Sequence, residues 1–173
     1  MHPSSVDNMR KARRYVNTFP DMVILDVGGR ALKEDQERSY LPIWKDVAKD
    51  YHVADINAGH GVTHVMKGNY DLPFEAESVD LVVSGQTLEH VKNPFRSVIE
   101  MTRVLKSGGY IILIAPSAGK YHDSIDCWRF MDDAFQAIAE EAGLETITDY
   151  VDRSQPDERS RRWADHVFVG RKP

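Results

Sequence analysis

The sequence predicts a three-layer α/β fold built on a mainly parallel sheet. Two observations predict it. Short apolar runs recur along the chain, as is typical of strands covered on both faces of a parallel sheet. Stretches with apolar residues at helical spacing lie between most of these runs, and strands that alternate with helices form parallel sheets. Ligands of such sheets bind at the carboxyl ends of the strands, so functional residues are expected there.

The apolar runs predict seven strands. The first covers residues 22–27 and ends at two glycines, Gly28 and Gly29. The loop at residues 57–61 is too short for a crossover helix, so the third strand is expected to follow the second almost directly. The other predicted strands are residues 52–56, 64–67, 79–84, 110–115, 146–151 and 166–170.

Helices are predicted from apolar spacing and from residues that start or end a helix. Pro42 must start or kink a helix rather than stand in its middle. Asn93 and Pro94 are a suitable N-cap and first residue, residues 107–109 end that helix, and Gly143 ends the last one. The predicted helices are residues 7–18, the latter half of 33–50, 93–105 and 133–142.

The composition fits a single domain over residues 1–173. The chain has a mass of 19.7 kDa, and 42% of its residues are hydrophobic. The chain has 22 Lys and Arg residues and 27 Asp and Glu residues, and the resulting net charge of −5 disfavours nonspecific binding of nucleic acid. No apolar run approaches the roughly 20 residues that span a bilayer, and the polar start lacks a signal-peptide core. We therefore expect a cytoplasmic protein without a membrane partner.

Several residues are expected to be structural. Cys127 is the only cysteine, which excludes an internal disulfide, and no Cys/His cluster has zinc-finger spacing. Met101 and Met131 are expected in the core, and Cys127 is expected to be a small, partly buried hydrophobic residue. The basic tract at residues 159–163 is interpreted as a solvated loop, with a lid over an anionic substrate as the alternative.

A glycine turn and an acidic strand end indicate a nucleotide. Glycine has no Cβ and adopts positive φ, so Gly28 and Gly29 allow a ligand to approach the backbone. Asp55 ends the second strand, where a carboxylate can accept hydrogen bonds from both hydroxyls of a ribose. The alternative is a tight turn that Asp55 caps. Arg30 follows Gly29 and the G-x-G-x-x-G pattern is broken, which disfavours a nicotinamide-dependent oxidoreductase.

Five segments of the chain carry a family resemblance. They are VILDVGG (23–29), VADINAGHGV (53–62), YDLPFEAESVDLVVSGQTLEHV (70–91), NPFRSVIEMTRVLKSGGYIILIAP (93–116) and HDSIDCWRF (122–130). In this order they resemble a class I S-adenosylmethionine-dependent methyltransferase, of the compact type 11-like kind. The similarity covers about residues 20–170, and LEHV and RVLKSGG are its most specific parts. It implies a Rossmann-like sheet of about seven strands with an antiparallel last strand, and S-adenosylmethionine as cofactor.

The resemblance also implies a set of cofactor-binding residues. Asp55 matches the acidic residue that binds the ribose. Gly68 stands where members usually carry an acidic residue on the adenine amino group, so the backbone of Asn69 and Tyr70, or the Asp71 carboxylate, is expected to take its place. The end of the fourth strand matches the segment beneath the transferring methyl group. The implied residues are Asp26, Gly28, Gly29, Asp55, Ile56, Asn69, Tyr70, Asp71, Ser84 and Gly85.

Two histidines are candidate catalytic bases. In methyl transfer the protein mainly positions the acceptor, and removes a proton when the acceptor is a hydroxyl. His122 and His90 both follow strands at the expected active edge, and histidine titrates near neutral pH. We prefer His122, because the LEH segment of His90 is largely architectural in the family; a structural histidine is the alternative for each. His122, Asp123 and Asp126 could also ligate Mg²⁺, but pairing of Asp126 with Arg129 is favoured, so no metal site is predicted.

The predicted function is methyl transfer from S-adenosylmethionine to an oxygen or nitrogen of a small acceptor, such as a saccharide or natural product. The alternative is a noncatalytic cofactor-binding or scaffold subunit with a degenerate methyltransferase fold, which the altered glycine loop and the absent adenine carboxylate suggest. The core consumes most of the chain. Either the pocket is open and the acceptor large, or a second copy in a homodimer covers it.

Overall fold

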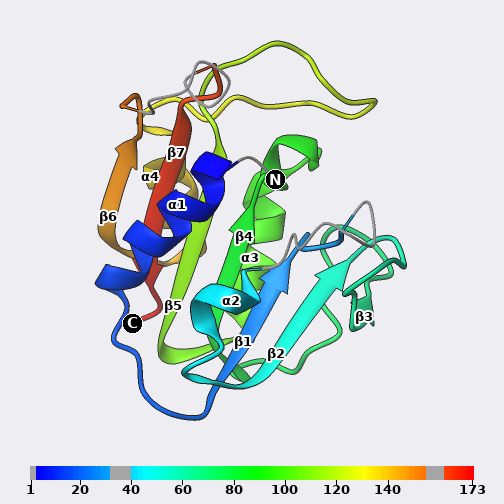
Figure 1. Ribbon diagram of the computed structural model, residues 1–173, viewed down its shortest axis with the longest axis vertical. Helices are drawn as coiled ribbons and strands as arrows, with labels where there is room; N and C mark the ends of the chain where they lie inside the picture. Colours follow the sequence, from blue (N-terminus) through cyan, green and yellow to red (C-terminus); the bar gives the residue numbers. More distant parts are fainter. Residues whose placement is uncertain (1–2, 32–39, 155–161) are drawn as a thin grey trace.

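The computed structural model describes residues 3–31, 40–154 and 162–173, which contain one seven-stranded sheet (Figure 1). The strands are β1 (Met22–Val27), β2 (Ala48–Asp55), β3 (His64–Val65), β4 (Val79–Gly85), β5 (Leu105–Pro116), β6 (Glu145–Val151) and β7 (Asp165–Arg171). Their spatial order is β3-β2-β1-β4-β5-β7-β6. Six strands are parallel, and β7 is antiparallel to both β5 and β6. The predicted α/β sheet with an antiparallel last strand is confirmed.

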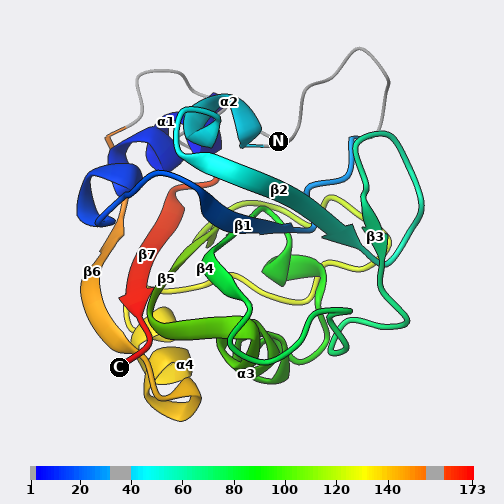
Figure 2. The same ribbon diagram turned by 90° about the horizontal axis from the view of Figure 1, so that it is seen from below.

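Helices cover both faces of this sheet. The helical segments are α1 (Pro3–Ala12), η1 (Arg13–Tyr15), α2 (Leu41–Trp44), η2 (Leu88–His90), α3 (Pro94–Val104) and α4 (Ala134–Ala142). In Figure 2, which views the sheet from below, α1 and α2 lie on one face and α3 and α4 on the other. This arrangement is the three-layer architecture that alternating strands and helices predict.

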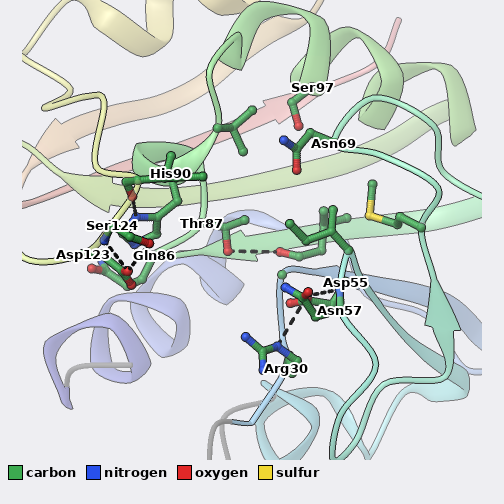
Figure 3. Close-up of a pocket in the computed structure, with 16 residues that line it drawn as sticks. Arg30, Asp55, Asn57, Asn69, Gln86, Thr87, His90, Ser97, Asp123 and Ser124 are labelled. Carbon is green, nitrogen blue, oxygen red and sulfur yellow. Dashed lines mark hydrogen bonds and ion pairs between the residues drawn. The ribbon is translucent and has the colours of Figure 1, made fainter.

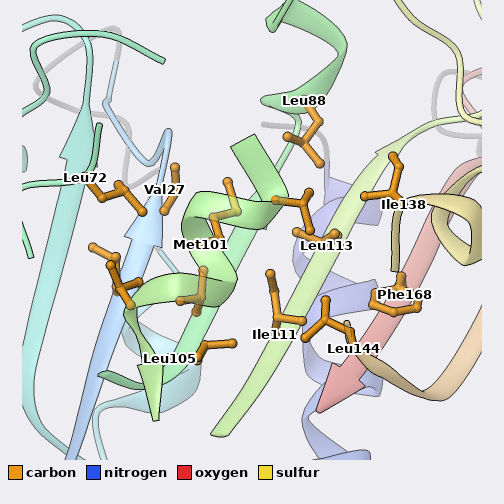
Figure 4. Close-up of a cluster of buried hydrophobic side chains, with 14 of the residues drawn as sticks. Val27, Leu72, Leu88, Met101, Leu105, Ile111, Leu113, Ile138, Leu144 and Phe168 are labelled. Atoms are coloured by element: carbon orange, nitrogen blue, oxygen red, sulfur yellow. The ribbon is translucent and has the colours of Figure 1, made fainter. Parts of the chain in front are cut away.

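The larger core fills the space between the sheet and the pair α3 and α4 (Figure 4). Met101 of α3 and Ile138 of α4 pack with Ile111, Leu113 and Phe168 of the sheet, and none of these side chains is more than 2% exposed. Burial of each such side chain contributes about 1.5 to 3 kcal/mol. This face therefore holds β4 and β5 rigidly beneath the loops that follow them.

A second core lies on the opposite face. Met9 of α1 and Trp44 of α2 are fully buried there, against Ile24 of β1, Ile112 of β5 and Val167 of β7. The central strands therefore have apolar side chains on both faces. Strands of this kind appear in the sequence as continuous apolar runs rather than alternating ones.

Two helix ends follow their sequence signals. The Asn93 side-chain oxygen accepts a hydrogen bond from the Arg96 backbone N–H at 3.1 Å, and Pro94 is the first residue of α3. Gly143 has a φ of 69° after α4, and its N–H donates to the carbonyl of Glu140. The start of α3 and the end of α4 were thus predictable from the local sequence.

The boundaries near the N-terminus differ from the prediction. The first helix is Pro3–Ala12 rather than 7–18, and α2 has only four residues, with Pro42 near its start. β2 begins at Ala48 instead of residue 52, because Ala48 already pairs with Met22 of β1. The charged residues at the start of β2 are exposed and carry no strand pattern, so only the pairing reveals the strand.

β5 also begins earlier than predicted. Leu105 pairs with Val79 of β4, and Gly108 and Gly109 exchange backbone hydrogen bonds with Lys172. Residues 107–109 therefore lie within the strand, and α3 ends at Val104 before them. Local glycine content suggested a helix end, whereas long-range pairing makes this segment a strand.

Two predictions of burial were wrong and one is confirmed. Met101 is 1% exposed, as expected. Met131 is 61% exposed because it lies in the turn before α4, where its carbonyl accepts the Ala134 N–H. Cys127 is exposed rather than partly buried. Residues 159–161 of the predicted basic loop lie outside the described residues.

None of the helices in the described part of the chain combines the length and the apolar character that a membrane span requires.

Candidate functional site

The strand order reverses between β1 and β4. From β1 the chain continues outward through β2 and β3, and then returns to start β4 on the other side of β1. In an open α/β sheet the crevice at the carboxyl ends of such strands is where ligands bind. A cavity of about 340 Å³ lies at this point (Figure 3). Its lining residues are Val27, Gly28, Arg30, Asp55, Ile56, Asn57, Met66, Asn69, Gln86, Thr87, His90, Val91, Ser97, Asp123, Ser124 and Ile125.

The turn after β1 is fixed by β4. Gly28 has a φ of 82°, and a Cβ on it would lie 2.1 Å from the Thr87 hydroxyl oxygen. Ser84 donates its hydroxyl hydrogen to the Val27 carbonyl at 2.9 Å, and Thr87 donates to the same carbonyl at 3.4 Å. Close approach of the two strands therefore requires glycine at position 28, and its backbone borders the cavity.

Asp26 and Gly29 lie beneath this turn rather than in the cavity wall. A Cβ on Gly29 would lie 2.7 Å from the Asp26 carboxyl group. Asp26 is buried and accepts hydrogen bonds from the Tyr51 hydroxyl at 2.8 Å and the Tyr40 N–H at 3.2 Å. Burial raises the pKa of Asp26 to about 7. These residues shape the turn from below.

Asp55 borders the cavity at the end of β2. Its carboxylate accepts the Asn57 N–H at 2.8 Å, so it also makes the turn contact that the alternative interpretation predicted. The Arg30 Nε atom lies 3.5 Å from Asp55 Oδ1, as an ion pair rather than a hydrogen bond. Figure 3 shows Arg30, Asp55 and Asn57 together on one side of the cavity.

The other predicted cofactor residues divide into two groups. Ile56 and Asn69 line the cavity. Tyr70 instead accepts the Asn93 N–H at 3.0 Å through its hydroxyl oxygen, and its ring lies under the Arg96 guanidinium. Asp71 is exposed outside the cavity wall.

The end of β4 is packed rather than open. Ser84 is 1% exposed and holds the Val27 carbonyl. A Cβ on Gly85 would lie 1.7 Å from the Tyr40 hydroxyl oxygen, so glycine makes room for that ring. The two residues support the turn between β1 and β4 and do not line the cavity.

The two candidate histidines are neighbours on the opposite side of the cavity from Asp55. His90 ends η2 and lines the cavity, and its ring centroid lies 5.1 Å from that of His122. His122 is not in the cavity wall, but the three residues that follow it, Asp123, Ser124 and Ile125, are. The structure therefore brings together two side chains that are distant in sequence.

Each imidazole is oriented through its Nδ1 atom. His90 Nδ1 donates to the Ile125 carbonyl, and His122 Nδ1 donates to Asp126 Oδ2 at 2.9 Å. Arg129 Nη2 lies 3.5 Å from His122 Nδ1, but the shorter contact to an ionised carboxylate places the proton on this nitrogen. With Nδ1 as the donor, the lone pair of each ring in this tautomer lies on Nε2.

Asp126 is held by Arg129. Its two carboxylate oxygens accept bonds from the Arg129 guanidinium at 2.5 and 2.7 Å, which holds the pKa of Asp126 far below its usual range. Asp123 binds the Ser124 N–H at 2.6 Å. The favoured pairing of Asp126 with Arg129 is confirmed, and the described residues do not assemble His122, Asp123 and Asp126 as a set of free Mg²⁺ ligands.

The comparisons with known proteins show the family of the chain. Residues 25–113, just over half of the chain, match the family model described as a methyltransferase domain. The chain belongs to the methyltransferase domain family. An uncharacterised methyltransferase of Mycobacterium avium (strain 104) is 33% identical over 95 residues, which are 52% of this chain and 38% of the relative. The chain thus spans less than half the length of the curated relatives it matches.

Solved structures share the fold of this methyltransferase domain at low identity. An S-adenosylmethionine-dependent methyltransferase from Aquifex aeolicus has a TM-score of 0.67 and 16% identity, over 98% of this chain and 93% of that chain. The [4+2]-cyclase SpnF has a TM-score of 0.69 and 15% identity, over 96% of this chain and 81% of that chain. A protein named for a different reaction, the cyclase SpnF, therefore shares this fold.

Some cavity residues of the methyltransferase domain were not predicted. Arg30 and Asn57 directly follow predicted site residues, so their position beside a strand end was a usable signal. Gln86 and Thr87 follow β4. Gln86 donates a hydrogen bond to Asp165 at 3.0 Å, and a contact between residues 79 positions apart cannot be predicted from the local sequence.

Glu89 was also missed. It is 0% exposed, and no described residue donates a hydrogen bond to either of its carboxylate oxygens. Burial raises the pKa of Glu89 to about 8. Its neighbour His90 was singled out, but the local sequence does not show that Glu89 points into the protein.

Proposed function

We propose that the chain transfers a methyl group from S-adenosylmethionine to an oxygen or nitrogen of a small acceptor. The observation that carries this proposal is the cavity at the strand reversal of a methyltransferase-family sheet. One side of it has a glycine turn and a carboxylate, and the other side has an imidazole (Figure 3). A cofactor side and an acceptor side therefore meet in one space.

The cofactor side fits an adenosine-containing ligand. The cavity volume of about 340 Å³ lies within the usual range for ligand pockets. Gly28 presents backbone without a Cβ, and Asp55 presents a carboxylate that suits two ribose hydroxyls. Ile56 and Asn69 complete the proposed contact set, whereas Tyr70 and Asp71 lie outside it.

Four further residues act on the cofactor site through its shape. Asp26 and Gly29 support the turn after β1, and Ser84 and Gly85 support it from β4. S-adenosylmethionine, when bound, supplies a methyl group activated by a sulfonium. The chain contributes a fixed turn, so the bound ligand meets a backbone whose position is already set.

The acceptor side contains His90 and His122. Each ring donates from Nδ1, so each Nε2 lone pair can accept the proton of an acceptor hydroxyl. His90 lines the cavity directly, whereas His122 is not among the lining residues, although the next two residues, Asp123 and Ser124, are. We propose His90 as the group in contact with acceptor and His122 as its neighbour in the same cluster.

One observation favours a noncatalytic cofactor-binding or scaffold subunit instead. Arg30 already lies against the Asp55 carboxylate that is proposed to bind ribose. A cation held there competes with the ribose hydroxyls. If Arg30 keeps this position, the site binds the cofactor weakly, and the fold serves a role without turnover.

Isothermal titration with S-adenosylhomocysteine tests the proposal. We expect one-to-one binding to the native chain, and at least about 10-fold weaker binding to Asp55→Ala, because hydrogen bonds to a charged group contribute about 1.5 to 3 kcal/mol. Asp50→Ala is the matched control, since Asp50 is exposed near the start of the same strand. Absence of binding to the native chain, or equal affinity in Asp55→Ala, would contradict the proposal.

A further inference from the structure

A cluster of three potential ligand atoms lies beside the cavity. One carboxylate oxygen of Glu89 and one ring nitrogen each of His90 and His122 lie within 4.8 Å of one another. Glu89 and His90 belong to η2, after β4, whereas His122 belongs to the loop after β5. Two adjacent strands of the sheet therefore deliver these side chains to one point.

Glu89 is the first reason to regard the cluster as a cation site. Its side chain is 1% exposed, and no described residue donates a hydrogen bond to either oxygen. A buried carboxylate without a partner is costly, and such groups in proteins are normally hydrogen-bonded, paired or metal-bound. His90 Nε2, the nearest described ring nitrogen to it, lies 3.7 Å from Oε1. That distance is too long for a hydrogen bond, yet suits two ligands of one ion.

The orientation of the histidines is the second reason. A histidine that binds a metal through one nitrogen usually donates its other N–H to a carbonyl or a carboxylate, which fixes the tautomer. His90 does so to the Ile125 carbonyl, and His122 does so to Asp126 at 2.9 Å. These hydrogen bonds at Nδ1 leave the Nε2 lone pair of each histidine available to bind a metal ion.

The donor set selects the class of ion. Two imidazole nitrogens and one carboxylate oxygen suit Zn²⁺, Fe²⁺ or Co²⁺, whereas Mg²⁺ and Ca²⁺ prefer oxygen ligands throughout. Ligand bonds of about 2.1 Å in a tetrahedron place the ligand atoms about 3.4 Å apart. The cluster thus closes around an ion by side-chain shifts on the order of 1 Å.

The charges around the cluster also favour a cation. The Asp126 carboxylate lies 2.9 Å from the His122 ring nitrogen, so a second negative charge borders the cluster, and Arg129 is the cation beside it. Arg129 is itself occupied by both oxygens of Asp126. A divalent ion would offset the carboxylate of Glu89, which these contacts leave without a partner.

We propose that Glu89, His90 and His122 bind one divalent transition-metal ion at the edge of the cavity. Three protein ligands leave a coordination position open, as in catalytic zinc sites. His90 and the segment from Asp123 to Ile125 line the cavity, so the open position is next to the acceptor side. With the ion bound, the Nε2 lone pairs of His90 and His122 serve as ligands and no longer accept a proton directly. A hydroxyl bound at the open position instead loses its proton to water more readily. This catalytic role rests on the proposed function, whereas the metal site does not.

Titration with Co²⁺ tests this site. The untagged full chain is first treated with a chelator, and Co²⁺ binding is then followed by visible absorption and by calorimetry. We expect one ion per chain, with d–d absorption typical of a site with fewer than six ligands. His122→Ala and Glu89→Gln should each weaken binding at least 10-fold, with the fold checked by circular dichroism.

His64→Ala is the matched control. Among the residues that the structure describes, His64 of β3 forms the other close histidine pair, with its ring centroid 5.0 Å from that of His52 in β2. This variant should retain the Co²⁺ affinity of the native chain. Absence of stoichiometric binding, affinity unchanged in His122→Ala, or loss of binding in His64→Ala would overturn the assignment. If Glu89→Gln does not fold, His122→Ala decides, because its side chain is 31% exposed on a loop.

The two proposals fail separately. Co²⁺ binding without binding of S-adenosylhomocysteine contradicts the proposed function and supports the metal site. Binding of S-adenosylhomocysteine without Co²⁺ binding supports the proposed function and contradicts the metal site. In that case the metal-free histidines are the groups that accept the proton.

Discussion

Asp26 connects the buried end of β1 to the pH dependence of stability. Burial raises its pKa to about 7, from about 4 in the unfolded chain. Between these values the folded chain keeps the proton and the unfolded chain releases it, so the contribution of Asp26 to the free energy of unfolding falls as pH rises from about 4 to 7. Over this range the native chain loses about 4 kcal/mol of the contribution of Asp26, and we predict that Asp26→Asn removes this loss.

Urea unfolding of the native chain and of Asp26→Asn, at a series of pH values from 4.5 to 8, checks this prediction. The difference between the two free energies of unfolding should change steadily in favour of the variant as pH rises. A difference that is independent of pH contradicts the assigned state of Asp26.

Gly28 offers a second test at the residue scale. Its positive φ and the 2.1 Å approach of a Cβ to Thr87 act together. Gly108 has nearly the same φ, 81°, but there the nearest atom to a Cβ is 3.5 Å away. We predict that Gly28→Ala lowers the free energy of unfolding more than Gly108→Ala, by about 1 to 3 kcal/mol for the clash. Equal losses in chemical denaturation would show that Thr87 does not restrict position 28.

At this scale the sequence predicted the residues that stand at strand ends. Gly28 follows β1, Asp55 ends β2, and His90 ends η2 shortly after β4. These residues border the cavity because the parallel sheet aligns the carboxyl ends of these strands. The ion pair of Arg30 with Asp55 and the approach of His122 to His90 depend on how distant loops fold back. Such contacts leave no local pattern.

Among the elements, α3 tests how much a local signal contributes. The Asn93 side chain accepts the Arg96 N–H and so satisfies one free donor at the start of the helix. We predict that Asn93→Ala lowers the free energy of unfolding by about 1 kcal/mol and leaves the affinity for S-adenosylhomocysteine unchanged. Thermal or chemical unfolding measures the first quantity and calorimetry the second. A stability equal to that of the native chain would mean that the cap contributes nothing.

The elements that were predicted well are those with strong local chemistry. α3 and α4 have capping residues and helical spacing, and the buried strands have apolar runs. The start of β2 has exposed Lys49 and Asp50, and the start of β5 has two glycines, so neither segment resembles a strand. Pairing with β1 and β4 creates both of them, and pairing between distant segments is not encoded locally.

The whole molecule determines whether the acceptor side is complete in one chain. The sheet and its covering helices use most of the described residues, and the loop between β5 and α4 lines the proposed acceptor side of the cavity (Figure 1). A homodimer that covers this side stays a prediction. Sedimentation velocity at micromolar concentration should give a dimer, and a single monomer peak would contradict it.

The same cavity links ligand binding to the stability of the whole fold. A ligand that binds only the folded chain raises the free energy of unfolding by about 2.7 kcal/mol at 100 times its dissociation constant. We predict that saturating S-adenosylhomocysteine raises the melting temperature by several degrees, and that the rise is much smaller in Asp55→Ala. A melting temperature that does not respond to the ligand would contradict binding to the folded state.

A crystal structure of the complex with S-adenosylhomocysteine tests the central claim most directly. The claim predicts density for the ligand in the cavity between the ends of β1 and β4, with the ribose hydroxyls on the Asp55 carboxylate and Arg30 displaced from it. Density at another surface, or an Asp55 carboxylate that still holds Arg30 and makes no ligand contact, would contradict it.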